Sequence, residues 1–510
     1  MLRSKAMKLN ERKAGVILSY MQIVVGIVSM LFYTPAMLRL MGQSEYGIYN
    51  LAASAISNLN LFKAGFSSAY MRYYLKYKNA NDEDSVKRIN GAFLLIFLVM
   101  MTITFVVGGF IVIKAHLFFD QKLTPQELYK TKVVMGIMTF NMGIIFPTNI
   151  FSAYIRANER YVFQRGLQLL KTILNPFIML PVLLMGGKSI GMAIVTASIS
   201  IILEYSFVVY SLFKLKMSFS FKGINFGEFK DIGKFSFFVF LNTLVNQLNS
   251  NVDNILLGIY HGTKAVAIYG VATHLRMYFN TFSSAIYTVF VPQIHKLVNM
   301  GNRNRELSAM FAKVGRIQFF ILAMIEVGFV FFGKQFMVIW GGKAYEEAYL
   351  ITLILLSIAI VPMIQDMGEE IQRAMNLHHY RSVVYGSVVV LNVLISIPLC
   401  KQYGILGCTV GTAIAEWGGK VIAMNIIYHN KLNVDMIYFW KEIAKGLRGM
   451  IIPAISGFMI MILAPLDNMA VFFACGFLFV IIYCVSIWKF SLNEYEKSLA
   501  NGIIKKLLRR

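Results

Sequence analysis

Residues Ala92–Ile113 read AFLLIFLVMMTITFVVGGFIVI and contain no charged side chain. A helix needs about 20 predominantly apolar residues to cross a bilayer, and this stretch is long enough. Strands of a transmembrane barrel alternate apolar and polar residues with period two, whereas this stretch is apolar on every side. It therefore predicts a membrane-spanning α-helix and argues against a β-barrel.

The same pattern recurs along the whole chain of 510 residues, and no connection between the runs is long enough to fold as a separate domain. The sequence therefore predicts an all-α integral membrane protein with 14 transmembrane helices. The expected spans are centred in 14–36, 46–70, 91–113, 132–155, 166–186, 190–213, 233–259, 265–291, 309–332, 348–372, 382–400, 404–428, 448–466 and 469–490.

Composition supports this reading. Hydrophobic residues make up 57% of the chain and charged residues 15%, and the mean hydropathy is +0.62. Soluble domains have about 45–50% apolar and about 25% charged residues, so a soluble protein is excluded. The net charge of +24 would suggest nucleic acid in a soluble protein. A chain with so little polar surface offers no face for it, so we expect no nucleic-acid partner.

The 49 Lys and Arg residues are distributed unevenly between alternate connections. With the N-terminus inside, 35 fall in cytoplasmic segments and 10 in outer segments. Cytoplasmic loops of membrane proteins collect Lys and Arg, so both termini are expected in the cytoplasm and the protein in the cell (inner) membrane as a multi-pass protein. The remaining four lie within apolar runs: Lys63, Lys171, Arg276 and Lys420.

An internal repeat appears at an offset of about 217 residues. Arg156-Ala157 corresponds to Arg373-Ala374, and the Asn175 to Pro181 spacing corresponds to that of Asn392 and Pro398. The repeat predicts two six-helix lobes followed by two further helices. The expected domains are an N-terminal lobe at 1–213, a cytoplasmic interfacial linker at 214–232, a C-terminal lobe at 233–430, and the last two helices with a basic tail at 431–510.

Repeated helical halves around a central site are typical of transporters that work by alternating access. The first two helices of each half carry polar residues at helical spacing, so each stripe lies on one face of its helix. Asn and Ser also join membrane helices by hydrogen bonds. Four stripes in corresponding positions favour a shared aqueous cavity. Its expected polar residues are Gln22, Asn60, Asn242, Asn246, Asn249 and Asn280.

Ionisable groups inside membrane helices are costly, so each is a candidate site residue. Arg276 is the strongest, because it lies near the middle of its run and a guanidinium can bind phosphate with two hydrogen bonds. Lys63 lies closer to the cytoplasm and is a second candidate. Its long side chain could equally extend to the membrane surface.

Acidic residues in the runs fall into two groups. Glu416 with Lys420, and Glu369 with Arg373, are four residues apart and are expected to pair along a helix. The other group has no obvious local partner, and a buried carboxylate could couple transport to H⁺ or Na⁺. Its members are Glu204, Asp253, Glu326 and Asp366. No catalytic residue, metal site or other cofactor is expected.

The first hairpin, Tyr33–Tyr49 (YTPAMLRLMGQSEYGIY), is followed by the Lys63-Ala-Gly65 turn and the helix end Ala69–Tyr73. In these motifs the sequence resembles the polysaccharide flippases (Wzx-like, polysaccharide transporter family) of the multidrug/oligosaccharidyl-lipid/polysaccharide (MOP) exporter superfamily. Fourteen helices, duplicated lobes and inward termini agree with that resemblance over the whole chain.

The resemblance implies a fold like those of MATE transporters and MurJ, and a transport protein rather than an enzyme. It implies that an undecaprenyl-pyrophosphate-linked oligosaccharide is flipped from the cytoplasmic to the outer leaflet for surface polysaccharide (O-antigen or capsule) biosynthesis. Arg276, Lys63 and Arg39 would bind the phosphates in a cavity between the lobes. The bilayer, a polysaccharide polymerase and glycosyltransferases are the implied partners.

Three alternatives remain open from the sequence. A lipid II flippase or a related sporulation protein shares the helix count and the cationic cavity. A drug/cation antiporter of the same superfamily would have twelve helices and an acidic cavity, which the cationic Arg276 and Lys63 oppose. A membrane glycosyltransferase or polymerase would need catalytic carboxylates or histidines on a sizeable extramembrane loop, and the sequence contains no such loop.

Overall fold

The computed structural model describes residues 2–222, 226–301 and 303–508. Side chains are described for these residues except 2–10, 12, 13, 16, 20, 60–65, 226–250 and 503–508. Within the described residues every regular element is helical and none is a strand. The all-α prediction is therefore confirmed for this part of the chain.

The chain divides into two compact units, Met1–Ala267 and Ile268–Arg510. The division falls inside helix α9 (Phe226–Tyr287), C-terminal to the linker expected at 214–232. The part of α9 before the division belongs to the first unit through polar contacts: the Asn254 side-chain amide donates to the Ser54 hydroxyl at 3.0 Å.

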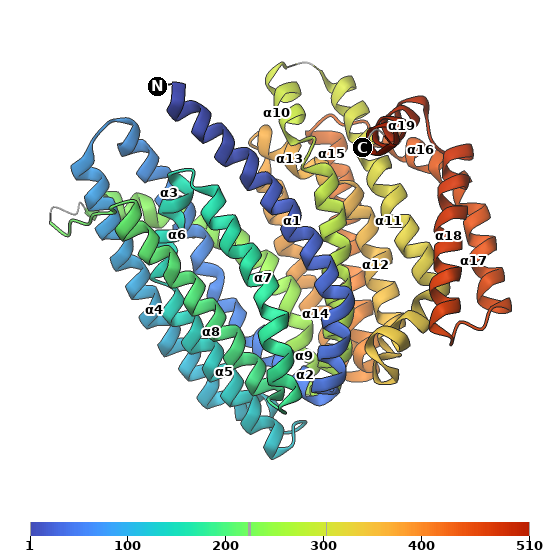
Figure 1. Ribbon diagram of the computed structural model, residues 1–510, viewed down its shortest axis with the longest axis horizontal. Coiled ribbons are helices and arrows are strands. Elements are labelled where there is room, and N and C mark those ends of the chain that lie inside the picture. The colour runs from blue at the N-terminus through green and yellow to red at the C-terminus, as the bar shows by residue number, and fades with distance from the viewer. Residues whose placement is uncertain (1, 223–225, 302, 509–510) are drawn as a thin grey trace. The chain divides into compact units, whose positions relative to one another are not determined.

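The first unit contains the helices drawn from blue to green in Figure 1, together with the first part of α9. They are α1 (Leu2–Met41), α2 (Gln43–Ser57), α3 (Leu61–Asn79), α4 (Glu83–Phe119), α5 (Pro125–Ile145), α6 (Thr148–Ala157), α7 (Tyr161–Leu184) and α8 (Lys188–Val209), with a 3₁₀ turn η1 (Asn58–Asn60) and a π-helical end η2 (Tyr210–Lys214).

The second unit begins with the rest of α9 and runs to the C-terminus. Its helices are α10 (Val291–Asn299), α11 (Asn304–Gly341), α12 (Ala348–Ile364), α13 (Asp366–Ala374), α14 (His378–Glu416), α15 (Met424–Lys431), α16 (Met436–Leu447), α17 (Ile451–Leu463), α18 (Met469–Phe490) and α19 (Glu494–Leu508), with 3₁₀ turns η3 (Lys343–Tyr345) and η5 (Arg448–Met450) and a π-helical segment η4 (Trp417–Ala423).

Among the described residues, ten helices are long and apolar enough to cross a membrane, or eleven if the bent pair α5 and α6 forms one span. This count is lower than the fourteen separate helices expected. One reason is that expected spans are joined in continuous helical stretches: α9 contains a non-helical residue at Gly262, and α14 contains one at Gly404. Another is that the expected span at 46–70 is interrupted by η1, which separates α2 from α3.

Helix α14 doubles back at Gly404, which has a φ of 63°. The Thr412 hydroxyl donates to Asn392 Oδ1 at 3.1 Å. In a straight helix these two residues would lie roughly 30 Å apart at 1.5 Å per residue. A Cβ on Gly411 would lie 2.4 Å from the Ser396 hydroxyl oxygen, so the two arms pack closely where glycine has no side chain. This one element therefore contains two antiparallel helical arms.

Residues with positive φ recur at nearly the offset of the sequence repeat. Such backbone angles end or break a helix, because a regular α-helix requires negative φ. The corresponding positions, with their φ values, are Gly42 (77°) with Gly262 (79°), Glu159 (59°) with Asn376 (58°), and Gly186 (82°) with Gly404 (63°). The corresponding turns in the two halves of the sequence repeat thus share their backbone conformation as well as their spacing.

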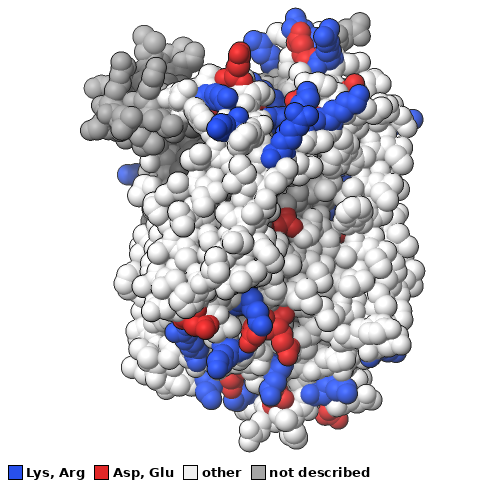
Figure 2. All heavy atoms as spheres, turned by 90° about the vertical axis from the view of Figure 1, so that its right-hand side faces the viewer, with Lys and Arg blue, Asp and Glu red and all other residues white. Residues whose placement is uncertain are grey.

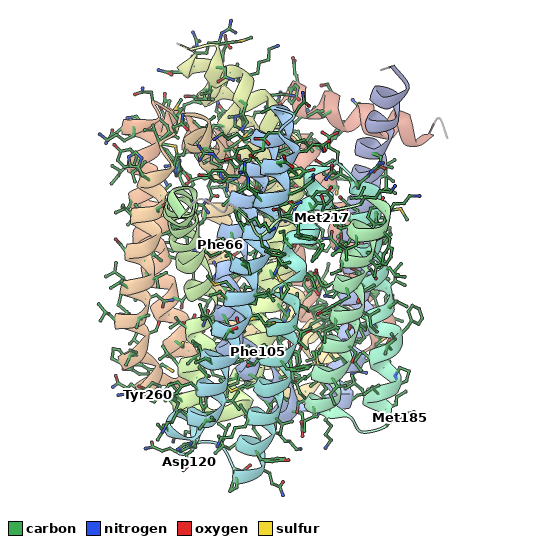
Figure 3. The ribbon with its side chains drawn as sticks, turned by 90° about the vertical axis from the view of Figure 1, so that its left-hand side faces the viewer. Phe66, Phe105, Asp120, Met185, Met217 and Tyr260 are labelled. Carbon is green, nitrogen blue, oxygen red and sulfur yellow. The ribbon has the colours of Figure 1, made fainter. Side chains whose placement is uncertain are left out.

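The helices of the first unit run between two ends, as Figure 3 shows. Asp120, Met185 and Tyr260 lie at one end, Phe66 and Met217 lie toward the other, and Phe105 lies between them. Packing near Phe66 is aromatic: the ring centroids of Tyr70 and Phe93 are 5.3 Å apart in an edge-on arrangement. Such pairs add to the apolar burial that holds neighbouring helices together.

The second unit presents an uncharged surface where α17 and α18 lie. On the face that Figure 2 shows, charged side chains gather at two ends, and a broad band between them has almost none. Large apolar side chains of α18 are exposed, including Phe473, Phe477 and Val485. An apolar band of this kind is suited to the hydrocarbon region of a bilayer.

Polar residues begin several helices and satisfy the free N–H groups there. Thr124 and Glu127 form a reciprocal capping box at the start of α5. Asp82 caps α4 by accepting the Ser85 backbone N–H at 2.9 Å. Hydrogen bonds from the Ser85 hydroxyl and backbone hold the pKa of the exposed Asp82 carboxyl below its usual range.

Candidate functional site

The strongest sequence candidate, Arg276, lies in the part of α9 that belongs to the second unit. It lies near the middle of the helical stretch from Gly262 to Tyr287, so roughly 15–20 Å of helix separates it from each end. Its side chain is 22% exposed. A partly exposed cation at this depth in an apolar helix needs an anionic partner.

That partner is Glu416, the last residue of α14. Arg276 Nη2 donates to Glu416 Oε2 at 2.6 Å, and Lys420 Nζ donates to Oε1 of the same carboxylate at 2.7 Å. The Glu416 side chain is only 1% exposed, whereas that of Lys420 is 15% exposed. Two cations therefore share one buried carboxylate, and the three side chains together carry a charge of +1. We call Arg276, Glu416 and Lys420 the cationic triad.

The segment that carries Lys420 is not a regular α-helix. Lys420 lies in the π-helical segment η4, which follows Glu416 directly. π-Helical segments are rare in proteins, and those that do occur often lie at functional sites. The expected Glu416–Lys420 pair is confirmed, but the sequence did not indicate Arg276 as a third member. Arg276 and Glu416 are 140 residues apart in sequence, and no local spacing of residues indicates such a contact.

Charged and aromatic side chains continue from the triad. Lys420 Nζ lies 5.4 Å from the centroid of the Tyr385 ring, and the guanidinium of Arg381 lies 4.7 Å from the same centroid. The Tyr385 hydroxyl donates to Glu369 Oε1 at 3.0 Å, and Arg381 pairs with that oxygen at 2.9 Å.

One expected pair is wrong in this region. Arg373 forms its ion pair with Glu370 at 2.6 Å, three residues away, and Glu369 pairs instead with Arg381 of the next helix. The sequence suggested a pair within one helix, whereas a contact between α13 and α14 provides Glu369 with a cation. Glu370 is also the more deeply buried of the two acids, so its charge has the greater need of a partner.

A second buried arginine in the same unit differs from Arg276. The Arg316 side chain is 3% exposed and makes a two-bond ion pair with Glu496, at 2.7 and 2.9 Å. It also donates to the backbone carbonyls of Glu442 at 2.6 Å and Ser491 at 2.8 Å. Arg316 of α11 thus joins α16 and α19. Sequence reasoning placed it among the cytoplasmic cations and did not detect this role.

The hairpin motif that carries the family resemblance forms a polar junction in the first unit. Glu45 accepts hydrogen bonds from Lys130 and from the Ser189 hydroxyl, so it joins α2 to α5 and α8. The Ser44 hydroxyl donates to Glu127 Oε1 at 2.5 Å. A Cβ on Gly47 would lie 1.9 Å from the Thr263 carbonyl oxygen. The polar and small residues of this motif therefore have packing roles that explain their spacing.

Besides Arg276, three predicted cavity residues have described side chains. Arg39 near the end of α1 is exposed, Gln22 on the same helix is half-buried, and Asn280 lies one turn after Arg276 and is exposed. The other predicted cavity residues lie outside the described side chains: Lys63, Asn60, Asn242, Asn246 and Asn249. The structure therefore brings Arg276 and Asn280 together on one helix and gives no position for those five side chains.

The four acids considered for ion coupling lie in different surroundings. Asp366 Oδ2 accepts the Ser283 hydroxyl at 2.9 Å, and Glu204 accepts the Thr148 hydroxyl at 3.4 Å. Glu326 of α11 is half-buried.

Asp253 of α9 is buried. In the described part of the chain, no group of three or more His, Cys, Asp or Glu residues could hold a metal ion.

A family model, a curated protein and several solved structures are similar to this chain. A family model described as "Polysaccharide biosynthesis protein" matches residues 12–298. A probable flippase, AglR of Haloferax volcanii, is 23% identical over 194 residues. That match covers 37% of this chain and 40% of the curated relative, so the chain spans two fifths of its length.

Two solved structures have the same fold. The lipid II flippase MurJ in an inward closed conformation matches with a TM-score of 0.69 at 16% identity, covering 97% of this chain and 99% of that one. An inward-facing multidrug resistance MATE family transporter of the MOP superfamily matches with a TM-score of 0.61 at 13% identity, covering 82% and 99%. The expected MATE/MurJ-like fold is confirmed.

Proposed function

Because the chain belongs to the polysaccharide biosynthesis protein family, we propose that it is a flippase that moves a lipid-linked oligosaccharide across the cell membrane. The proposed substrate is an undecaprenyl-pyrophosphate-linked repeat unit, carried from the cytoplasmic to the outer leaflet by alternating access. In this account the protein is a transporter, and glycosyltransferases and a polymerase act before and after it in surface polysaccharide synthesis.

The cationic triad is the observation that carries this proposal. The pyrophosphate of such a substrate is strongly anionic, and it must cross the apolar region. Arg276 can donate two parallel hydrogen bonds to phosphate oxygens, and electrostatic attraction is stronger at low dielectric than in water. Glu416 stabilises the two cations before substrate arrives, and the remaining charge of +1 favours an anionic ligand over a cationic drug.

We propose that sugar hydroxyls are bound by the predicted polar stripes, with Gln22 and Asn280 as described members. Asn60, Asn242, Asn246 and Asn249 stay predictions, as do Lys63 and Arg39 for the phosphates. Asp253, Glu204, Glu326 and Asp366 remain proposed sites of H⁺ or Na⁺ coupling. Each acid can be replaced in turn by its amide. If one of them carries the coupling ion, its replacement should remove the response of transport to the ion gradient.

The proposed topology has fourteen crossings in two repeated lobes, with both termini in the cytoplasm. Matched turns at Gly42 with Gly262 and at Gly186 with Gly404 support the repeat. The antiparallel arms of α14 support counting it as two crossings. The excess of Lys and Arg in alternate connections supports the orientation.

A lipid II-type flippase is the second candidate. The fold similarity to MurJ over 97% of this chain supports this alternative. Lipid II is also a lipid-linked sugar pyrophosphate, so the cationic triad would serve both substrates. The sugar that accumulates when the protein is absent separates the two.

Cells that lack the protein provide the test. We expect lipid-linked oligosaccharide to accumulate in the cytoplasmic leaflet and to be restored to the outer leaflet by the wild-type chain. Arg276→Ala should fail to restore it, whereas Arg303→Ala, which removes an exposed ion pair with Glu306, should restore it fully. Full restoration by Arg276→Ala would contradict the proposed phosphate site, and accumulation of lipid II would favour the second candidate.

A further inference from the structure

We propose that Lys420 is the residue that makes the site select a lipid diphosphate over a lipid monophosphate, and that Glu416 positions Lys420 beside Arg276 for this purpose. The inference rests on the proposed function, because it concerns the same anionic ligand. It assigns separate roles to two residues whose spacing alone suggested only a pair within one helix.

The Glu416 carboxylate is shared between two cations. Arg276 contacts Oε2 of Glu416 and Lys420 contacts Oε1, so each cation has its own oxygen. Without an anion between them, two cations so close would repel each other, and at low dielectric the repulsion would amount to several kcal/mol. Glu416 therefore fixes the spacing of the two cations, as a positioning residue that need not touch the substrate.

The members of the triad differ in how far a ligand can reach them. Glu416 is 1% exposed, whereas Arg276 is 22% and Lys420 is 15% exposed. The carboxylate is thus covered and the two cations form the accessible surface. An approaching anion meets two positive groups, and it replaces none of the contacts that hold Glu416 in the protein.

Lys420 is restrained by its neighbours. A lysine in an apolar helix can normally extend toward the membrane surface. Here the ammonium is held by Glu416 at 2.7 Å and lies 5.4 Å from the Tyr385 ring centroid. The ring is in turn held by the hydrogen bond from its hydroxyl to Glu369. Lys420 is therefore directed to the triad before a ligand binds.

These contacts predict separate roles for the two cations in binding phosphate. A monophosphate is small, and the guanidinium of Arg276 can bind it alone through two hydrogen bonds. A diphosphate has a second phosphoryl group that reaches the neighbouring ammonium as a point-charge contact. A hydrogen bond to a charged group contributes about 1.5–3 kcal/mol, so the second contact should make diphosphate binding at least tenfold tighter.

The experiment measures binding of farnesyl diphosphate and farnesyl monophosphate to the full chain in detergent. For the wild type we expect at least a tenfold lower Kd for the diphosphate. Lys420→Gln should bring the two Kd values within about threefold of each other and leave the monophosphate Kd within about threefold of wild type. Arg276→Gln should weaken both probes at least tenfold.

Lys431→Gln is the matched control. Lys431 lies at the end of α15, in the same continuous stretch as Lys420, and its ammonium lies 5.8 Å from the ring of Tyr380. This variant should keep the wild-type preference. If Lys420→Gln also keeps the full preference, the assignment of Lys420 is wrong while the proposed function stands. If the wild type binds neither probe, the proposed function fails, and this assignment fails with it.

Glu416 needs a separate test, because it is buried. Glu416→Gln should retain monophosphate binding but lose the preference for diphosphate, since the cations are no longer held at a fixed spacing. A merely structural role would instead lower the melting temperature and leave the preference intact in the folded fraction. If Glu416→Gln does not fold, Glu416→Asp, which keeps the charge on a shorter side chain, should show a reduced preference, and an unchanged one would overturn the positioning role.

Discussion

Arg276 and Arg316 are both paired with a buried glutamate in the second unit, yet they differ in two respects. Arg316 is 3% exposed and its acid, Glu496, is also 3% exposed. Arg276 is 22% exposed, and Lys420 shares its acid. The Arg316 guanidinium also lies 3.6 Å from the Glu442 carboxylate, so it faces two acids and leaves no positive charge in excess. The triad instead has a charge of +1 and an accessible side.

The difference shows how to separate a structural ion pair from a binding site. Arg316 directs its guanidinium donors at Glu496 and at two backbone carbonyls, which hold α16 and α19 against α11. A guanidinium with these contacts links neighbouring helices and has a structural role. In the triad a carboxylate holds two cations, so an additional anion is electrostatically favoured there.

Removing the buried Arg316 pair should have the largest effect on folding. Arg316→Ala leaves the Glu496 carboxylate buried without its guanidinium, and breaking such a pair costs about 3–5 kcal/mol. We expect a large drop in the melting temperature of the purified protein and in its yield. Arg303→Ala, at an exposed pair, should change the melting temperature little. A near-normal melting temperature for Arg316→Ala would contradict the structural role.

Removing the accessible cation should have the largest effect on transport. Arg276→Gln leaves Glu416 paired with Lys420, so most of the folded protein should remain. Loss of a charge-assisted hydrogen bond, about 1.5–3 kcal/mol, should reduce transport roughly 10–100-fold. The measurement is the initial transport rate per folded molecule. An unfolded Arg276→Gln protein would place Arg276 with Arg316 and remove the distinction.

Lysine substitutions sharpen the comparison, because they keep the charge and remove the planar fork of donors. Arg316→Lys cannot reach Glu496 and both carbonyls at once, so its melting temperature should fall, though less than in Arg316→Ala. Arg276→Lys should bind farnesyl monophosphate about tenfold more weakly with little change in melting temperature. Equal melting-temperature losses in the two variants would mean that both arginines are structural.

Removing an exposed carboxylate should have the smallest effect on stability. Asp82→Ala removes the cap of α4 and should lower the melting temperature only slightly. Because the folded-state pKa of Asp82 lies below its usual value, its contribution is present above about pH 4 and is lost as the pH falls through the folded-state pKa. The difference between wild type and Asp82→Ala should therefore shrink at acidic pH, and a difference that grows there would contradict the cap.

The sequence predicted the general fold well, because apolar runs report helices that face lipid. It also indicated Arg276 from its depth alone, and the Glu416–Lys420 pair from its helical spacing. Local spacing failed for Glu369, whose cation Arg381 comes from the next helix. It also gave no sign of the Arg276–Glu416 contact, since contacts between distant helices leave no periodic pattern.

The number of helices was harder to predict from the sequence for a related reason. Hydropathy separates apolar runs at polar residues, but a chain can reverse at one glycine inside a continuous helical stretch, as at Gly404. A 3₁₀ turn can likewise interrupt a run, as η1 does between α2 and α3. Runs and helices therefore correspond poorly where backbone angles, rather than composition, decide the boundary.

The most direct test of the central claim is transport by the purified chain in lipid vesicles. A lipid-diphosphate-linked oligosaccharide with a fluorescent label is incorporated, and its exposure to a membrane-impermeant quencher is followed over time. The wild type should expose the inner-leaflet substrate faster than empty vesicles do, and folded Arg276→Gln should do so at least tenfold more slowly than wild type. Equal rates for the wild type and folded Arg276→Gln would contradict the claim that the cationic triad binds the transported diphosphate.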